Sequence, residues 1–150
     1  MAYILVYRPS TVSPSGIFYA KAVVNGINGI ILLPDDWDAT YYTLSNTNSK
    51  TSNFSSNTIS ESDWLNQLEP HGAVFFPAYG YLKTADTNPP QWVYLNEYVC
   101  YYLSSRSKIS TTAAWAVDFF FVQNGNQTQN FIRDGERRNG MPVRLIKDVQ

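Results

Sequence analysis

The alternation of apolar and polar residues is clearest near the start of the chain, where two β-rich runs flank short Asn-Gly pairs. Residues 16–33 read GIFYAKAVVNGINGIILL, with Asn25-Gly26 and Asn28-Gly29 interrupting the apolar pattern. Asn and Gly tolerate the positive φ that a tight hairpin turn requires. The pattern predicts a β-hairpin whose second strand ends in four large aliphatic residues, Ile30 to Leu33, as is typical of a buried strand.

The strand ends abruptly at Pro34, which two carboxylates and Trp37 follow. Adjacent residues on a strand point to opposite faces, so Asp35 and Asp36 cannot easily act as an acid–base pair unless a turn intervenes. We therefore favour an Asx-type turn or a helix N-cap over a catalytic pair, with Pro34 fixing the bend and Trp37 packing beneath it.

Residues 41–60 consist almost entirely of Ser, Thr and Asn, with Leu44 and Phe54 as isolated apolar anchors. This composition predicts a long polar loop. Ser60 then begins the clearest helix, over residues 60–69. Ser60 and Asp63 have the spacing of a capping box in which Asp replaces the usual Glu.

The apolar residues of this helix are expected on one face, formed by Trp64, Leu65 and Leu68, and Ile59 can pack onto Trp64 as a hydrophobic staple. Pro70 and Gly72 are expected to end the helix.

The second half of the chain is dominated by short β-rich runs. Strands are expected at 72–82 with a break at Pro77, at 91–105 as one or two strands, at 113–122, and at 141–149. Strands with one or two helices and long loops predict an α+β fold. A length of 150 residues suits one domain spanning 1–150.

Composition narrows the possible functions. Aromatic residues make up 15% of the chain, including 11 Tyr, and Tyr-rich surfaces are often recognition surfaces. The net charge is −1 and no basic stripe is present, which argues against a nucleic-acid partner. No apolar run reaches the roughly 18 residues of a membrane span, so direct membrane insertion is not expected. The start, MAYILVYRPS, lacks a signal peptide and reads as the middle of an element, so we expect a fragment of a longer domain.

Candidate chemical groups are few. The single His71 follows a helix end, where it can bond the last carbonyls, and no Gly-x-Ser-x-Gly nucleophile motif accompanies it. The single Cys100 lies between bulky residues at strand spacing, so a buried, inert thiol is expected.

One Cys and one His exclude an internal disulfide and a zinc site of the usual kind, and no EF-hand or phosphate-binding glycine loop is present. Asn53 and Asn126 begin glycosylation sequons, which matter only in a eukaryotic secretory setting. We expect no enzyme activity, no cofactor and no metal.

Four blocks resemble one family closely. They are YAKAVVNGINGIILLPDDW at 19–37, SDWLNQLEPHGAVFFPAYGY at 62–81, YYLSS at 101–105 and RRNGMPVRLIKDV at 137–149. The matching family patterns are a Trp-bearing helix followed by Gly-Ala-Val-Phe-Leu-Pro-Ala-x-Gly-Tyr, Tyr-Tyr-Trp-Ser-Ser, and Arg-x-x-Gly-x-x-Val-Arg-Leu-Val-Arg-Asp. In order and spacing the chain is similar to the Fibrobacter succinogenes major paralogous domain family, found in surface lipoproteins of gut Bacteroidetes and in related phage proteins.

This resemblance implies a C-type-lectin-like fold, in the branch that also contains formylglycine-generating enzymes and the variable proteins of diversity-generating retroelements. Twisted antiparallel strands with flanking helices and long irregular loops are expected. The Pro34–Trp37 turn is then a structural landmark of the family.

Three departures from the family limit what the resemblance implies. Members usually carry a longer segment before YILVYR, and Leu103 stands where they favour Trp. The calcium and sugar motifs of classical C-type lectins, Glu-Pro-Asn or Gln-Pro-Asp with Trp-Asn-Asp, are absent, so calcium-dependent sugar binding is not implied.

In the retroelement branch the diversified segment would correspond to residues 103–139 here. Within AAWAVDFFF, Ala114, Ala116 or Val117 are candidate core positions and Trp115, Asp118 and Phe120 candidate surface positions. Aromatic anchors with nearby Arg and amide groups have hot-spot composition. The expected ligand-binding residues are Leu103, Arg106, Lys108, Trp115, Asp118, Phe120, Asn126, Arg133 and Arg137.

Two alternatives remain open for this segment. Trp115 and Phe119–Phe121 can instead fill the core. Retroelement mutagenesis acts on adenines, typically in AAC codons, which cannot yield Trp, Lys, Gln or Glu. Several residues here are of those types, so recent diversification of every position is not expected.

The leading hypothesis is a non-catalytic binding domain on a bacterial cell surface, in the extracellular space or on a phage particle. It would hold a protein or glycan ligand on another cell or surface for adhesion. The second hypothesis is a structural module of a surface lipoprotein or pilus with no ligand site. An oxidoreductase of the formylglycine-generating type would need cysteines in an active cleft, and Cys100 alone does not provide them.

Overall fold

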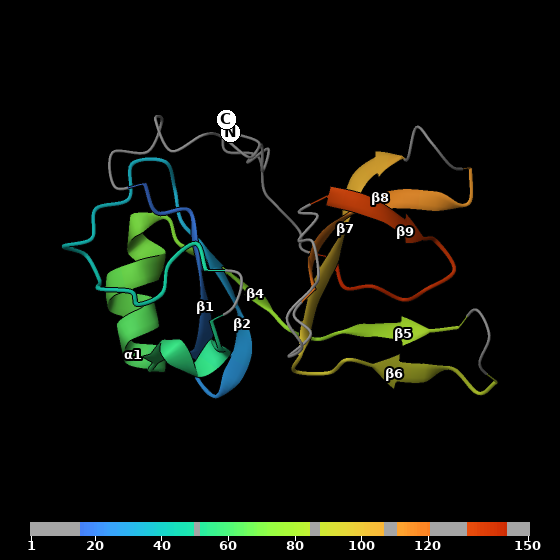
Figure 1. Cartoon of the computed structure of the whole chain (residues 1–150), viewed down its shortest axis with the longest axis horizontal. Helices are drawn as coiled ribbons and strands as arrows, with labels where there is room; N and C mark the ends of the chain where they lie inside the picture. Colours follow the sequence, from blue (N-terminus) through green and yellow to red (C-terminus); the bar gives the residue numbers. More distant parts are fainter. Residues whose placement is uncertain (1–15, 50–51, 85–87, 107–110, 121–131, 144–150) are drawn as a thin grey trace. The chain divides into compact units, whose positions relative to one another are not determined.

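The computed structural model describes residues 16–49, 52–84, 88–106, 111–120 and 132–143, and only the backbone of residues 103–106, 115, 117–120 and 132–134. The chain divides into two compact units, with Ala78 in the first and Tyr79 in the second (Figure 1). The fold is α+β, with mostly short strands, one helix over residues 61–71 and a 3₁₀ turn at Phe54–Ser56 among the described residues, as the sequence predicts for the class. Whether the two units make one domain stays a prediction.

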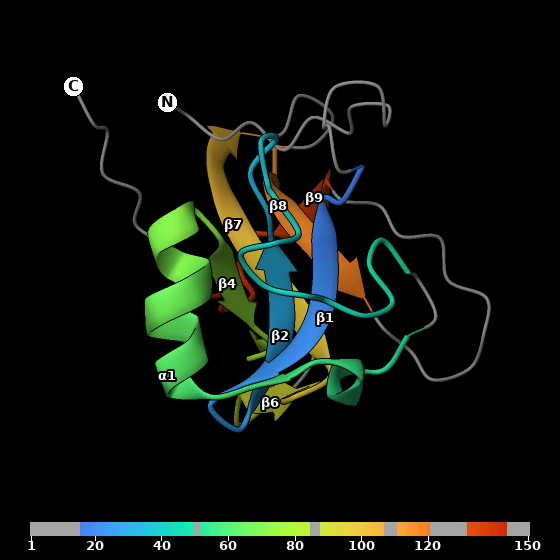
Figure 2. The ribbon, with the colours of Figure 1, turned by 90° about the vertical axis from the view of Figure 1, so that its left-hand side faces the viewer.

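The first unit is built on a four-stranded sheet in the order β3-β1-β2-β4. The strands are β1 (Tyr19–Val24), β2 (Ile27–Leu32), β3 (Thr58–Ile59) and β4 (Val74–Pro77). Strand β2 pairs antiparallel with both β1 and β4, whereas β3 runs parallel to β1. Figure 2 shows β1, β2 and β4 side by side with the helix next to them.

The predicted hairpin is confirmed at Asn25-Gly26. Val24 pairs with Ile27 across a two-residue turn, and Asn25 and Gly26 have φ values of 48° and 78°. Positive φ at both central residues is the signature of a type I′ turn, whose twist matches that of the flanking strands. The second Asn-Gly pair lies inside β2, where Gly29 is buried.

The predicted helix is present and continues slightly further than expected. Helical residues run as an α-helical turn α1 (Glu61–Asp63), a π-helical turn (Trp64–Leu68) and a 3₁₀ turn (Glu69–His71). Pro70 lies inside the last turn, and Gly72 ends the helix with φ 85°. A left-handed glycine at this position is a common helix C-cap.

The capping box is confirmed in its main contact. The Ser60 hydroxyl oxygen accepts the backbone N–H of Asp63 at 3.0 Å and donates to Asp63 Oδ2 at 2.8 Å. Asp is one methylene shorter than the usual Glu, and its carboxylate holds the cap hydroxyl. His71 Nδ1 bonds the Gln67 carbonyl at 2.8 Å, as expected for a histidine at a helix end.

The predicted apolar face of the helix is wrong for Leu65. Leu68 is fully buried, but Leu65 is 52% exposed. Trp64 and Leu68 are four positions apart and lie on one side, whereas Leu65 is rotated by about 100° from Trp64. Ile59 is 2% exposed and belongs to the cluster against which Trp64 packs, consistent with the staple.

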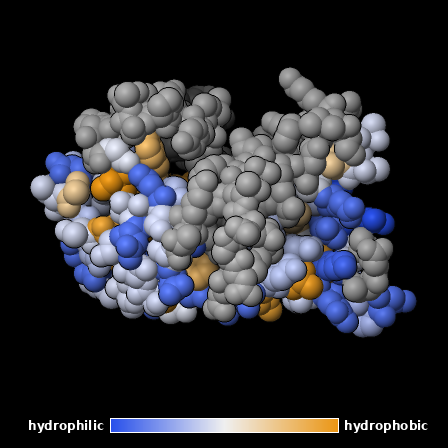
Figure 3. Space-filling model, in the orientation of Figure 1, coloured by the Kyte–Doolittle hydropathy of each residue, from blue (hydrophilic) through white to orange (hydrophobic). Residues whose placement is uncertain are grey.

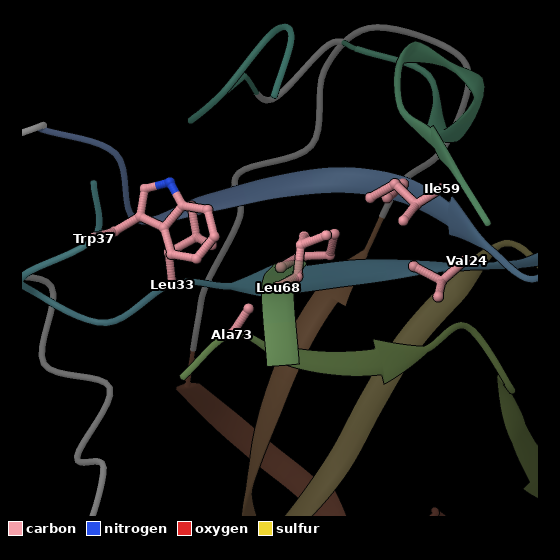
Figure 4. Packing of buried hydrophobic residues seen from close by; sticks show 8 residues of the cluster. Val24, Leu33, Trp37, Ile59, Leu68 and Ala73 are labelled. Atoms are coloured by element: carbon pink, nitrogen blue, oxygen red, sulfur yellow. The ribbon is translucent and has the colours of Figure 1, made fainter. Parts of the chain in front are cut away.

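The core of the first unit lies between the helix and one face of the sheet (Figure 4). Trp37 is its largest member, Leu68 is fully buried in it, and Leu44 and Phe75 pack at its margin. The cluster of buried residues comprises Ala22, Val24, Ile31, Leu33, Trp37, Ile59, Leu68 and Ala73.

The turn after β2 is structural, with Trp37 beneath it as predicted. The Trp37 N–H donates to the Pro34 carbonyl at 3.1 Å, and Asp35 and Asp36 are exposed between them. An Asx-type hydrogen bond forms two residues beyond the expected pair, where Asp38 Oδ1 accepts the Thr40 N–H at 2.8 Å. Hydrogen bonds from Thr40 lower the pKa of Asp38.

The polar loop is anchored by two asparagines that the apolar pattern did not reveal. Asn57 is 7% exposed; its Nδ2 donates to the carbonyls of Lys21 (2.8 Å) and Ser45 (3.0 Å), and its Oδ1 accepts the Ser45 N–H (2.7 Å). Asn48 Oδ1 accepts the Phe18 N–H at 2.9 Å. These bonds satisfy buried backbone groups that a loop without a ladder would leave unpaired.

Lys21 is an unexpected buried cation in β1. It is 4% exposed, its Nζ donates to the Ser52 carbonyl at 2.7 Å, and burial lowers its pKa from 10.5 to about 8. Below pH 8 the lysine is charged in both the folded and the unfolded chain, so burying the charge costs stability throughout that range. Between 8 and 10.5 the folded chain has released a proton that the unfolded chain still holds, so stability rises with pH.

We therefore expect the free energy of unfolding to gain about 3 kcal/mol from Lys21 as the pH rises through this window. The Lys21→Met variant should lose that gain, and Lys83→Met, which removes a half-buried lysine of the second unit, should keep it. Urea unfolding at a series of pH values measures the difference between wild type and variant. This subtraction removes the contribution of tyrosines such as Tyr42, whose pKa is raised by burial and then by Asp63. Parallel pH curves for wild type and Lys21→Met would contradict the assignment.

The second unit contains a two-stranded sheet and a three-stranded sheet. The first pairs β5 (Tyr81–Lys83) with β6 (Gln91–Val93), and the second has the order β7-β8-β9. Its strands are β7 (Tyr98–Arg106), β8 (Ala113–Phe120) and β9 (Ile132–Glu136), all antiparallel.

Three of the four strand segments expected for this half contain strands, one strand was missed, and the described part of the fourth segment is not in a strand. The break near Pro77 and the division of 91–105 into two strands are present. Strand β9 was missed because IRDGE is polar and contains a glycine, and pairing with β8 forms it. Residues 141–143 of the expected last strand are not in a strand, and Gly140 forms only an isolated bridge to Leu82. Residues 144–149 and the YILVYR segment lie outside the described residues.

Among the described residues, no helix has the length and apolarity needed to cross a membrane.

Candidate functional site

The sheet β7-β8-β9 carries most of the predicted ligand-binding positions. Leu103 and Arg106 lie in β7, Trp115, Asp118 and Phe120 in β8, and Arg133 in β9. Pairing of the three strands brings these sequence-distant positions into one sheet. Their side chains lie outside the described part of the structure, as do Lys108 and Asn126 altogether, so the assignment of this surface stays a prediction.

The strand register adds a constraint to that prediction. Ala116 pairs with Tyr102 on one side and with Arg133 on the other, and Trp115 pairs with Asp134. Neighbouring positions along a strand belong to opposite faces of a sheet. Positions 115 and 118 therefore belong to different faces, and a single patch contains at most one of them. Ala116, a candidate core position, is 1% exposed.

Arg137 is the one predicted site residue whose side chain is described. Its Nε donates to the Ala113 carbonyl at 3.0 Å, and its backbone N–H donates to the Thr112 carbonyl at 3.1 Å. Both bonds tie the end of β9 to the start of β8. The residue is exposed, so a ligand can reach the remaining N–H donors of its guanidinium group.

A cluster of tyrosines supports the beginning of β7. The rings of Tyr81, Tyr94 and Tyr98 lie within 5.9–6.2 Å of one another, centroid to centroid, in tilted or edge-to-face pairs. Tyr98 is 1% exposed, whereas Tyr94 is 45% exposed. The Tyr94 carbonyl accepts the N–H groups of Glu97 and Tyr98, both at 3.1 Å, which closes the turn between β6 and β7.

Gly80 connects this cluster to β5. Its φ is 61°, its N–H donates to the Tyr98 carbonyl at 2.8 Å, and its own carbonyl accepts the Cys100 thiol at 3.3 Å. Cys100 is buried, as the sequence predicts. The thiol therefore has a structural contact with the backbone.

The segment after β9 runs beside β5 and β7. Leu82 and Gly140 exchange two backbone hydrogen bonds of 2.8 and 2.9 Å, and the Tyr102 N–H donates to the Pro142 carbonyl at 3.2 Å. The Tyr102 hydroxyl contacts the carbonyls of Glu136 and Asn139, the latter at 3.0 Å. Burial, followed by Cys100 and Glu136, raises the pKa of Tyr102, so its hydroxyl keeps the proton that it donates.

An open, apolar pocket of about 520 Å³ lies between β5, β6 and this segment. Three of its side chains are largely exposed, namely Trp92 (56%), Leu95 (52%) and Tyr79 (44%). The complete lining is Tyr79, Leu82, Trp92, Leu95, Gly140, Met141 and Pro142. Figure 3 shows that the apolar residues visible on one face form small spots among hydrophilic ones.

The described lining of this pocket is mainly apolar. It contains no acid, histidine, lysine or cysteine, and the Tyr79 phenol is its one titratable side chain. Exposed Trp and Tyr rings beside an apolar hollow have the composition of recognition hot spots. Across the described residues, no group of three or more His, Cys, Asp or Glu is placed to hold a metal ion.

Sequence reasoning missed this pocket. Trp92, Leu95 and Tyr79 were read only as parts of strands, because alternation alone does not show which face of a short strand is covered. The one available signal was the run NPPQWVYLNE, in which large apolar residues occur beside turn-forming Pro and Asn.

Comparison with models of protein families finds a match to Parvovirus non-structural protein 1 over residues 79–145. The match covers less than half of the chain and so does not assign the chain to that family. No curated protein matches the sequence, and no solved structure matches the fold.

Proposed function

We propose that this α+β protein is a non-catalytic binding domain of the C-type-lectin-like class. In this proposal it holds a protein or glycan ligand for adhesion on a bacterial surface, in the extracellular space or on a phage particle. The observation that carries the proposal is the apolar pocket of the second unit, with the exposed Trp92, Tyr79 and Leu95 at its rim.

Physical reasons support a binding role for this surface. An exposed Trp costs solvation free energy in the free protein, and burying it against a partner recovers about 25 cal/mol per Å² of apolar area. Tyr and Trp also lose little conformational entropy on binding because each has only two side-chain torsions. The wall carries no charge, so the ligand group that enters it is apolar or aromatic.

The proposed ligand surface has two parts within the second unit. The pocket is the part whose side chains are described, and the segment 103–139 on β7-β8-β9 is the part that the family resemblance implies. In the retroelement interpretation, the second part would vary between copies of the gene while the pocket would stay constant. A reverse-transcriptase gene beside a near-copy of the segment encoding residues 103–144 would support that interpretation.

The Trp92→Ala variant tests the pocket. Binding to the ligand found on a glycan and surface-protein array should weaken at least about tenfold, the effect of losing a hot-spot residue. Stability should change by less than about 1 kcal/mol, because the ring is mostly exposed. Leu65→Ala is the matched control, since Leu65 is an exposed apolar residue (52%) of the first unit and should leave binding unchanged.

Trp115→Ala and Arg133→Ala test the second part in the same assay as separate variants, because the register places positions 115 and 133 on opposite faces of the sheet. Loss of binding in one of these two variants, with Trp92→Ala unchanged, assigns the ligand to that face of β7-β8-β9 and not to the pocket. Wild-type affinity in Trp92→Ala, Trp115→Ala and Arg133→Ala would contradict the binding proposal at both surfaces. It would leave the structural-module hypothesis as the better account.

A further inference from the structure

Three Asn-Gly pairs among the described residues differ sharply in their surroundings. They are Asn25-Gly26, Asn28-Gly29 and Asn139-Gly140, and a fourth pair, Asn124-Gly125, lies outside the described residues. An Asn-Gly pair can react with itself, because the glycine nitrogen can reach the side-chain amide carbon of the asparagine without a Cβ in the way. Whether it does so depends on the freedom of both groups.

At Asn25-Gly26 both groups are free. The two residues are exposed at the tip of the β1–β2 hairpin, and among the residues that the structure describes neither the Asn25 carboxamide nor the Gly26 N–H has a hydrogen-bond partner. A Cβ built at Gly26 meets no atom within 4 Å, so the space around the turn is open. Hairpin tips of this kind open locally at little free-energy cost.

The other two described Asn-Gly pairs are fixed by contacts with neighbouring atoms. Gly29 is buried inside β2, where a Cβ would meet the Phe76 carbonyl oxygen at 2.4 Å. The Gly140 N–H donates to the Leu82 carbonyl at 2.9 Å, and Asn139 Oδ1 accepts the Thr84 N–H at 3.4 Å. Reaction at either pair would first have to break these contacts.

We propose that Asn25 is a site of spontaneous deamidation and isomerisation. The Gly26 nitrogen attacks Asn25 Cγ and forms a new C–N bond. The bond from Cγ to the carboxamide nitrogen breaks, and that nitrogen leaves as ammonia with the proton from the Gly26 N–H. Water then adds to either carbonyl of the resulting succinimide, and ring opening gives aspartate or isoaspartate. Water is the only co-reactant, and no atom is oxidised or reduced.

The modification has a structural consequence at this position. Isoaspartate adds one methylene to the backbone of a turn in which only two residues separate the paired Val24 and Ile27. It also displaces the Asn25 N–H, which donates to the Ile59 carbonyl at 3.0 Å and so connects the hairpin to β3. Isoaspartate would thus accumulate with the age of the protein at the tip of the hairpin formed by the two central strands of the first unit's sheet.

The test is incubation of the full chain at mildly alkaline pH in water enriched in heavy oxygen, followed by peptide mass spectrometry. The heavy-oxygen label should enter at Asn25 at least about tenfold faster than at Asn28 or Asn139. A tenfold difference in rate is expected if opening the structure around Asn28 or Asn139 costs about 1.4 kcal/mol more than at Asn25. In denaturant the three rates should converge. Equal rates in the folded protein would overturn the proposal, as would an unlabelled Asn25 after the denatured chain has reacted fully.

Asn25→Gly provides the matched control, because glycine adopts positive φ without strain and carries no amide. Hydrogen exchange at Val24 and Ile27 should become faster in aged wild type and stay unchanged in the aged variant. Equal loss of protection in both proteins would overturn the assigned consequence.

Discussion

Replacing Trp37 with alanine is expected to lower the free energy of unfolding by about 3–5 kcal/mol, a large part of the roughly 5–15 kcal/mol that stabilises an ordinary domain. The indole is 2% exposed and belongs to the same buried cluster as Leu33 and Leu68. Its ring meets Tyr41 edge-on, with 5.6 Å between centroids. Alanine would leave a cavity between the helix and the sheet that the Pro34 turn, already closed by a backbone hydrogen bond, cannot collapse to fill.

The measurement is urea unfolding of the full chain followed by far-ultraviolet circular dichroism, with hydrogen exchange locating the loss of protection in residues 16–78. Leu65→Ala is the control, because its side chain is 52% exposed and its removal should change stability by no more than about 0.5 kcal/mol. A Trp37→Ala variant within about 1 kcal/mol of wild type would mean that the indole does not fill the core of this unit.

Features that depend on neighbouring residues could be predicted from the sequence. The Asn25-Gly26 turn, the Ser60 cap and the bond from His71 to a helix carbonyl each involve groups within four positions of one another. Their chemistry is fixed by local backbone geometry, which residue type and spacing report directly.

Features that depend on residues far apart in the sequence could not be predicted from the sequence. Strand β9 is polar and would not be expected alone, but five of its residues pair with β8. Asn57 reads as one more polar loop residue until its amide is seen bonded to Lys21 and Ser45, 36 and 12 positions away. Leu65 was misplaced because apolar residues in a helix suggest a buried face, although apolar residues also occur on surfaces.

The two parts of the candidate site show the same difference between local and distant features. The sequence placed Leu103, Trp115 and Arg133 in one segment by composition, and strand pairing shows how that segment forms a sheet. The pocket, in contrast, is made by Trp92 from β6 and Met141 from a segment 49 positions later, and no local pattern connects the two. The backbone bridge between Leu82 and Gly140 brings the two segments that line the pocket together, so the pocket depends on tertiary structure alone.

The Gly80→Ala substitution should destabilise the second unit by about 4 kcal/mol or more, because it combines two separate penalties. Gly80 has φ 61°, a conformation that costs an L-residue about 1–2 kcal/mol. In addition, the new Cβ would lie 2.1 Å from the Val93 carbonyl oxygen and 2.8 Å from backbone atoms of Tyr94. These are backbone atoms, so relief requires the end of β6 to move away from Gly80 and β5. That movement would disrupt the pairing of Tyr81 with Val93 and open the pocket at Trp92.

Gly16→Ala separates the two penalties. Gly16 has nearly the same φ, 65°, but a Cβ there meets nothing within 4 Å, so only the conformational cost of about 1–2 kcal/mol is expected. Urea midpoints for the two variants, with hydrogen exchange at Tyr98 and Cys100 reporting on the second unit, measure the difference. Equal losses in both variants would show that the backbone of β6 yields to the added methyl group. In that case the wall of the pocket is deformable, and Trp92 is not held in place for a ligand.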